Sequence, residues 1–173
     1  MLRNPPDAMR SSAYRTGALV LFAAAVVIGT ALAFEHIGGY KPCPLCLQQR
    51  YAYYAGIPAL FVALVLVSAE RPRIAAAVFL LVAVAFVANA GLGTYHAGVE
   101  WKFWPGPDTC AATAVQPLST GGGLLKDLAT TRVIRCDEAP WHFLGLSFAG
   151  WNVVVSLLLA MGAASAAAKA LRS

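Results

Sequence analysis

The sequence predicts an all-α membrane protein, built as a bundle of four transmembrane helices with one long outer loop. Of its 173 residues, 59% are hydrophobic and only 12% are charged, whereas soluble domains carry about 25% charged residues. The apolar residues are also concentrated in four long runs, which is typical of helices that cross a bilayer. At this length we expect the whole chain, residues 1–173, to form a single integral membrane domain.

Each run is long enough to cross the ~30 Å hydrocarbon layer as a helix of about 20 residues. The predicted spans cover about residues 16–34, 47–68, 74–95 and 146–168, with outer loops at about 35–46 and 96–145. Pro72 stops a continuous helix between the second and third spans. Small residues in the fourth span, as in Gly162–Ala166, allow close helix packing in lipid. No strand pattern accompanies the four runs, so we expect helices alone.

The basic residues next to the spans predict that both termini are cytoplasmic. An even number of crossings places three basic groups on one side: Arg3, Arg10 and Arg15, then Arg71 and Arg73, then Lys169 and Arg172. Cytoplasmic loops carry such an excess, whereas charges in a long outer loop count for less. Membrane orientation thus explains the net charge of +5, and no basic run with interleaved aromatics indicates nucleic-acid binding.

The first run also has features of a cleavable signal peptide, because a basic start is followed by Ala31-Leu32-Ala33. Its length of about 18 apolar residues exceeds the 7–15 that are usual for such a peptide. Ala25, Gly29 and Ala33 form a stripe of small residues suited to helix packing. We therefore expect a retained helix. Cleavage would leave the other helices oriented as before.

All four cysteines fall on the predicted outer side, in two pairs. Cys43 and Cys46 form a C-x-x-C pair just before the second span, and such a pair can close and reopen as a two-electron device. Cys110 and Cys136 lie in the long loop with 25 residues between them, and alone they fit a static disulfide. A zinc site is the other alternative. It is disfavoured because zinc sites of this kind have two closely spaced pairs.

Cys46 and two polar residues near the thiols, Arg50 and His96, are candidates for the site. Cys46 precedes the second span, where unpaired backbone N–H groups favour a thiolate. Arg50 follows one turn later and either reaches to lipid headgroups or supplies a permanent positive charge to the thiolate and an electron acceptor. His96 closes the third span and, taken alone, fits an interfacial hydrogen-bonding role. We expect Glu35 to be solvated, and Asn89 to join helices.

The combination of Cys43-Pro44-Leu45-Cys46, Arg50, a histidine fourteen residues before Cys110, and Cys136 leading into the fourth span is specific. It resembles the disulfide bond formation protein B (DsbB) family of bacterial inner membranes over nearly the whole chain. The resemblance implies a four-helix bundle whose long periplasmic loop carries a short amphipathic helix. The corresponding segment here is Leu124–Ile134, which polar residues and three preceding glycines make a weak membrane-binding helix.

The resemblance also implies a function, a quinone-dependent thiol oxidase that reoxidises a periplasmic thioredoxin-fold dithiol oxidase (DsbA-like). Cys110 and Cys136 would form the disulfide that accepts the partner's electrons, with Cys110 taking the mixed disulfide. Electrons would pass to Cys43 and Cys46, and Cys46, beside Arg50, would deliver them to ubiquinone or menaquinone. His96 matches a family position near the quinone. We expect no metal site, because the second cysteine pair is widely split. The resemblance implies an inner-membrane location with the redox cysteines in the periplasm.

Two other functions remain open from the residues. One is a membrane relative that runs thiols against quinones as a reductase, including an epoxide-reducing enzyme. The other is a non-catalytic metal-binding membrane protein. Quinone absorbance during a thiol-coupled reaction separates the first from the oxidase, and metal analysis with thiol counting decides the second.

Overall fold

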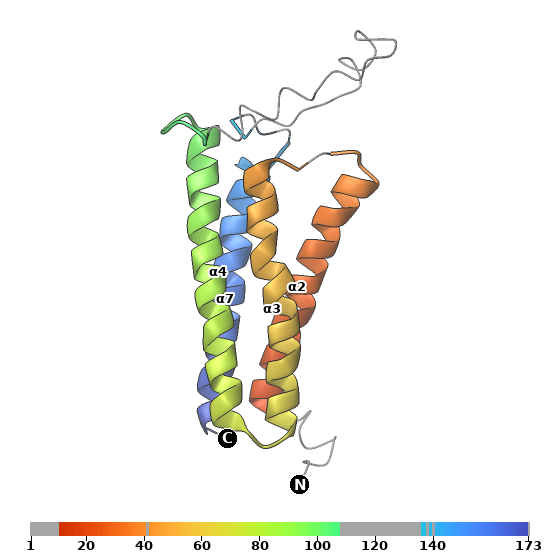
Figure 1. The fold of residues 1–173 in the computed structure, drawn as a ribbon, viewed down its shortest axis with the longest axis vertical. Helices are drawn as coiled ribbons and strands as arrows, with labels where there is room; N and C mark the ends of the chain where they lie inside the picture. The colour runs from red at the N-terminus through yellow and green to blue at the C-terminus, as the bar shows by residue number, and fades with distance from the viewer. Residues whose placement is uncertain (1–10, 41, 108–135, 138, 140, 173) are drawn as a thin grey trace.

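The computed structural model describes residues 11–40, 42–107, 136–137, 139 and 141–172. Four long helices stand side by side in it: α2 (Ser12–His36), α3 (Pro44–Ser68), α4 (Pro72–Glu100) and α7 (Phe148–Arg172) (Figure 1). Within the described residues, each of these helices is long and apolar enough to span a membrane. The predicted four-helix membrane fold is thereby confirmed. Cys110 and the predicted amphipathic helix at Leu124–Ile134 lie outside the described residues.

The helices are longer than the apolar runs predicted. The largest difference is in α4, which continues five residues past Tyr95 and ends where the Trp101 N–H donates to the Ala97 carbonyl at 3.0 Å. Hydropathy marks where apolar side chains end, whereas backbone hydrogen bonding can extend a helix beyond that point. His96 therefore lies inside a helix and does not close it.

A small antiparallel hairpin precedes α7, so the expectation of helices alone was wrong. It pairs β1 (His142–Phe143) with β2 (Leu146–Ser147). Its two turn residues both have positive φ, 51° at Leu144 and 82° at Gly145, which is the geometry of the two-residue turns that favour glycine. The hairpin delays the start of α7 to Phe148.

Local sequence sets where the helices begin. The Ser11 side chain accepts a hydrogen bond from the Tyr14 N–H at 3.2 Å and caps α2. Pro44 and Pro72 occupy the first positions of α3 and α4, where a missing N–H costs nothing. The prediction that Pro72 separates two helices is confirmed. At the start of α3 the cap is a cysteine, Cys43.

Close packing between helices depends on particular glycines. A Cβ on Gly17 of α2 would lie 2.7 Å from the ring of Phe79 in α4, and one on Gly162 of α7 would lie 2.6 Å from Val20. The prediction that small residues of the fourth span face its neighbours is thus confirmed. The expected stripe of Ala25, Gly29 and Ala33 was wrong, since all three are exposed. They sit about one third of a turn away from the face that α2 buries.

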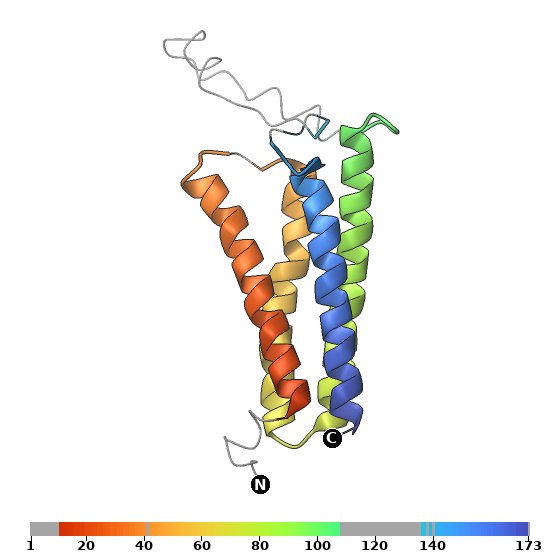
Figure 2. The same cartoon turned by 180° about the vertical axis from the view of Figure 1, so that it is seen from behind.

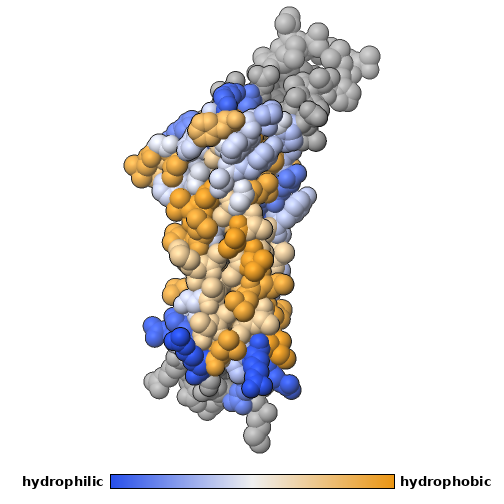
Figure 3. All heavy atoms as spheres, turned by 90° about the vertical axis from the view of Figure 1, so that its left-hand side faces the viewer, coloured by the Kyte–Doolittle hydropathy of each residue, from blue (hydrophilic) through white to orange (hydrophobic). Residues whose placement is uncertain are grey.

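The bundle is tight at one end and splayed at the other. Figures 1 and 2 both show α2 leaning away from the other helices toward the end where α3 begins and α4 finishes. We call this the thiol end, because Cys43, Cys46 and Cys136 lie there. Figure 3 shows an apolar belt across the middle of the bundle, with strongly hydrophilic residues gathered at the opposite end. The arrangement is that of a multi-pass membrane protein.

Candidate active site

The first turn of α3 brings the C-x-x-C sulfurs together. Cys43 is the N-cap residue, and its sulfur accepts a hydrogen bond from the Cys46 backbone N–H at 3.1 Å. The two sulfurs are 2.6 Å apart, and both cysteines are free thiols. Residues three apart at a helix start face the same side. The pair can therefore close into a disulfide with little movement of the backbone.

The structure locates the stabilised thiolate at Cys43, whereas we expected it at Cys46. Interaction with the Cys46 thiol is the main cause that lowers the pKa of Cys43 to about 5. Burial acts in the opposite direction, and the hydrogen bond from His96 lowers the pKa further. The difference arises because Cys43 is the capping residue: the Cys46 thiol, the ring of His96 and, as the smallest contribution, the Cys46 backbone N–H all face the Cys43 sulfur.

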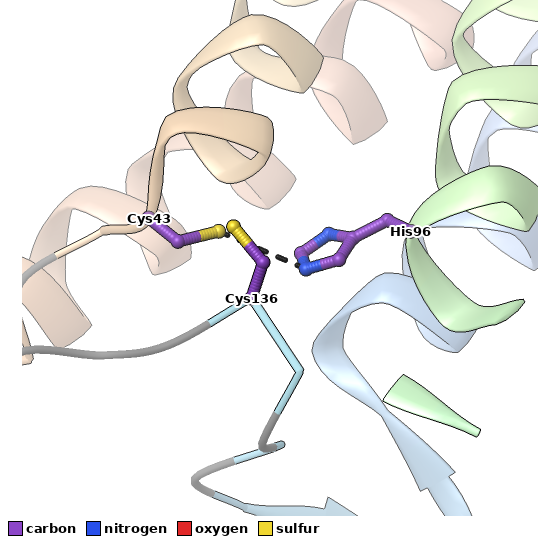
Figure 4. A group of neighbouring side chains, drawn as sticks. All are labelled: Cys43, His96 and Cys136. Carbon is purple, nitrogen blue, oxygen red and sulfur yellow. Dashed lines mark hydrogen bonds between the residues drawn. The ribbon is translucent and has the colours of Figure 1, made fainter. Parts of the chain in front are cut away.

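His96 approaches this thiol from α4. Its Nε2 lies 3.7 Å from the Cys43 sulfur (Figure 4). Its Nδ1 lies 2.8 Å from Nε2 of Gln49. The side chain is only 3% exposed, so His96 is a buried partner of the thiol and not an interfacial residue. Glu100 lies one turn further along α4, with an oxygen 3.9 Å from His96 Nε2, and it accepts a hydrogen bond from Ser147.

Cys136 joins the same group from the other side. Its sulfur, the Cys43 sulfur and a ring nitrogen of His96 all lie within 4.8 Å of one another, and all three residues are buried (Figure 4). Cys136 is disulfide-bonded. The C-terminal part of the predicted outer loop thus places one oxidised sulfur directly beside one free thiol.

A cavity of about 450 Å³ lies next to the thiols, between α2 and the other helices. Its walls are largely apolar and aromatic, and they include Val27, Ala31, Phe34, Trp141, Phe148 and Val155. Polar side chains also line it: Glu35, Cys43, Cys46, Gln49, Arg50, His96, Glu100 and Asn152. This size, with apolar walls and a few polar groups, is typical of small-molecule sites. The splay of α2 at the thiol end creates the space.

Arg50 and Glu35 form an ion pair across this cavity, from α3 to α2. Their side chains are 12% and 25% exposed. The expectation that Glu35 is solvated was wrong, because the last turn of α2 brings its carboxylate to Arg50. Arg50 itself lines the cavity together with Cys46, on the same face of α3.

Comparison with known proteins decides the family. The family model described as disulfide bond formation protein DsbB matches residues 14–166, from α2 into α7. The chain belongs to the DsbB family. Disulfide bond formation protein B of Aromatoleum aromaticum is 33% identical over 163 residues, which covers 88% of this chain and 93% of the relative. The protein of the same name in Xanthomonas oryzae pv. oryzae is 32% identical over 143 residues, or 78% of each chain. No solved structure matches significantly.

Membership of the DsbB family makes the chain a membrane protein of disulfide bond formation, with an oxidoreductase-type activity. Of the residues that the sequence singled out, the structure brings Cys43, Cys46, Arg50, His96 and Cys136 to one end of the bundle. Cys110 lies outside the described residues. The thiols and the cavity thus lie together at the thiol end of the bundle.

Sequence reasoning missed three polar residues of this DsbB site, namely Gln49, Glu100 and Asn152. Each lines the cavity and hydrogen-bonds another polar side chain. A signal was present for Gln49, since it is an amide in an apolar span and lies three residues after Cys46. For Glu100 the signal was its spacing, since it lies four residues after His96 and so on the same face of a helix. Asn152 had no comparable signal, because its partners are on α3 and α4.

The close approach of Cys43, His96 and Cys136 bears on the metal-binding alternative. A disulfide-bonded Cys136 has no thiolate to offer, which leaves two of these three donors. Zinc sites use three or four protein ligands. This donor set fits thiol exchange in the DsbB family better than a zinc site.

Proposed function

We propose that this DsbB-family protein oxidises the dithiol of a periplasmic DsbA-like, thioredoxin-fold partner and passes the electrons to membrane quinone. The observation that supports this most strongly is the position of Cys43. Its sulfur lies beside disulfide-bonded Cys136 on one side and beside Cys46, in the wall of an apolar cavity, on the other. One thiol therefore lies between a protein disulfide and a site for a lipid-soluble acceptor.

In the proposed exchange, a partner thiolate attacks Cys110 of a Cys110–Cys136 disulfide and releases the Cys136 thiolate. The second partner thiol resolves the mixed disulfide, so the partner leaves oxidised. The Cys136 thiolate then attacks Cys43 of a Cys43–Cys46 disulfide, and Cys46 leaves as a thiolate. Cys110 resolves the Cys43–Cys136 bond. Two electrons and two protons are then on the Cys43–Cys46 pair, and quinone accepts both to give quinol.

The cavity suits quinone as the electron-accepting substrate. Its apolar walls match a quinone ring and the beginning of an isoprenoid tail, and its volume is sufficient for both. Arg50 supplies a permanent positive charge where negative charge develops on a quinone oxygen. The quinone carries the redox chemistry, whereas the protein supplies position and charge. Ubiquinone and menaquinone both meet this description.

The proposed location is the bacterial inner membrane, with both termini in the cytoplasm and the thiol end in the periplasm. The start of α2 and the end of α7 share one end of the bundle (Figure 1). Basic residues of this end, including Arg15, Arg71 and Lys169, agree with a cytoplasmic side. An oxidising compartment at the thiol end is what disulfide chemistry requires.

The test is quinone-coupled oxidation of a reduced thioredoxin-fold protein by the purified chain in detergent. Quinone absorbance should fall in step with loss of partner thiols, and Cys136→Ser should stop both. Electron flow from quinol to a protein disulfide as the faster direction would favour the reductase alternative. Thiols that stay inert toward added quinone, together with stoichiometric bound zinc, would favour the metal-binding alternative and exclude the oxidase.

A further inference from the structure

A row of hydrogen bonds runs behind His96, across three helices. Gln49 of α3 lies between His96 of α4 and Asn152 of α7. Its Nε2 is 2.8 Å from His96 Nδ1, and its Oε1 accepts a hydrogen bond from Asn152 Nδ2 at 2.6 Å. Gln49 is only 6% exposed. The nitrogen and the oxygen of its side-chain amide thus both have hydrogen-bond partners, which define the orientation of the amide.

That orientation decides which nitrogen of His96 carries the proton. A neutral imidazole has one N–H donor and one bare acceptor nitrogen. Because the Gln49 amide donates toward Nδ1, Nδ1 is the acceptor and the proton is on Nε2. Nε2 faces the Cys43 sulfur at 3.7 Å. The ring therefore directs an N–H at the sulfur that holds the thiolate.

We propose that Gln49, oriented by Asn152, is a positioning residue that selects the Nε2–H tautomer of His96 and so supplies the Cys43 thiolate with a hydrogen-bond donor. The proposal deepens the proposed function and rests on it in so far as Cys43 is the sulfur that exchanges. If the side-chain amide of Gln49 were rotated by half a turn, its oxygen would accept a hydrogen bond from Nδ1–H of His96. A bare Nε2 would then face Cys43 and would favour the protonated thiol.

Asn152 is itself held in this orientation. Its Oδ1 accepts a hydrogen bond from the Tyr53 hydroxyl at 2.9 Å and lies 3.4 Å from Asn89 Nδ2. A reversed Asn152 would direct its own donors at Asn89 and withdraw the donor from Gln49. The orientation is thus transmitted from buried contacts of α3, α4 and α7 to the ring of His96 (Figure 4 shows its approach to Cys43).

Other groups also act on the Cys43 thiol, and they limit how much the loss of the Gln49 contact can change it. From α3 the Cys46 thiol and backbone N–H face it, from α4 His96 and, more distantly, Glu100, and from the other side Cys136. Arg50 and Glu35 line the adjoining cavity as an ion pair. Interaction with Cys46 is the largest cause of the lowered pKa of Cys43, ahead of His96. Removing the Gln49 contact should therefore weaken the thiolate without abolishing it.

The first test observes the protein with Gln49 and Asn152 unchanged. The histidines of the full-length protein in detergent are labelled with ¹⁵N, and the His96 signals are assigned from a His96→Asn sample. The expected spectrum of the reduced protein at neutral pH shows a protonated Nε2 and a bare Nδ1. A neutral ring protonated on Nδ1 would overturn the proposal, whatever the variants do.

The second test compares Gln49→Leu with Asn89→Leu. Each removes a buried amide with two polar partners, but Asn89 contacts Asn152 and Ser156 and not His96. The reduced proteins are alkylated in short pulses at a series of pH values, and the Cys43 peptide is quantified by mass spectrometry. Near pH 5 the rate at Cys43 should fall by about fivefold in Gln49→Leu, since a one-unit rise in pKa changes the thiolate ratio tenfold. It should match the wild type near pH 8.

Asn89→Leu should leave the Cys43 profile unchanged, because the Tyr53 hydroxyl still holds Asn152. Equal shifts in both variants would show a merely structural role and overturn the proposal, as would no shift in Gln49→Leu. Neither measurement uses quinone or a partner. If the protein lacks oxidase activity but shows the expected tautomer and Cys43 profile, the proposed function is contradicted and the role of Gln49 is not.

Discussion

Arg50 on α3 donates a hydrogen bond to Glu35 on α2 and so joins the two walls of the cavity beside the thiols. Both side chains are mostly shielded from solvent. Such a pair holds the guanidinium in place, and because arginine has five donors, further N–H groups remain beside those that face Glu35 and Tyr54. The pair therefore offers fixed positive charge at the cavity without leaving the carboxylate unpaired.

Arg50→Ala should raise the KM for quinone by about tenfold, since a hydrogen bond to a charged group contributes about 1.5–3 kcal/mol. Steady-state quinone reduction measures it. Arg73→Ala, an exposed change at the opposite end of the bundle, is the control for lost positive charge. Combining Arg50→Ala with Glu35→Gln removes the unpaired carboxylate and separates its effect. An unchanged KM in Arg50→Ala would contradict a role for Arg50 at the quinone.

Cys46→Ser should abolish quinone reduction while leaving the outer disulfide able to oxidise one equivalent of partner. The serine hydroxyl cannot form the disulfide with Cys43 that accepts the electrons from the outer pair. A rapid-mixing experiment with stoichiometric reduced partner should give one turnover and then stop. The matched control is Ser147→Ala, which removes a hydroxyl near the site but no thiol. Continued turnover in Cys46→Ser would refute its assignment.

The parts of this structure that the sequence predicted are those set by short-range patterns. The four spans follow from apolar runs, and the break between the second and third spans follows from Pro72. The C-x-x-C pair at a helix start follows from residue spacing alone. Cys43 as the capping thiol was not foreseen, because a pattern cannot say which of two neighbouring residues caps the helix. The outcome depends on backbone geometry, with Cys43 at ψ 163°.

The parts that the sequence did not predict arise from contacts between distant helices. Gln49 meets His96 and Asn152 only because α3, α4 and α7 pack together at the thiol end. Glu35 meets Arg50 only because α2 ends level with the second turn of α3. The Cys136 position beside Cys43 likewise depends on how the loop returns to the bundle. Asn152 and Glu35 are ordinary polar residues when the sequence is considered alone.

The reduced protein should become more stable to unfolding as the pH rises from about 5 to 8. The pKa of Cys43 is lowered to about 5 in the fold, so in this range the unfolded chain binds more protons than the folded one, and stability rises with pH. One titrating group changes the free energy of unfolding by at most about 1.4 kcal/mol per pH unit. The stabilisation is lost as the pH falls through about 5. Thermal unfolding in detergent measures it.

The control for this pH effect is the same protein with Cys43 and Cys46 oxidised to a disulfide, which has no thiol there to titrate. The difference in unfolding midpoint between pH 5 and 8 should be smaller in the oxidised form and in Cys43→Ser. A reduced protein whose midpoint does not change over this range, or which is more stable at pH 5, would exclude a thiolate at Cys43.

Gly17→Leu should destabilise the bundle by about 1–3 kcal/mol, the usual cost of overpacking. A Cβ there would lie 2.7 Å from the Phe79 ring, so the side chain can fit only if α2 moves away from α4. Gly29→Leu on the same helix is the matched control, because nothing lies within 4 Å of a Cβ at that position. Thermal unfolding of both variants in detergent should show the loss only for Gly17.

This close approach also bears on the cavity. The tight contact at Gly17 lies near the start of α2, and the cavity lies along its second half. If α2 pivots about that contact, Gly17→Leu should change the KM for quinone as well as the stability, although Gly17 does not line the cavity. Gly29→Leu should change neither. Equal destabilisation by both substitutions would show that the contact between Gly17 and Phe79 does not hold α2 in place.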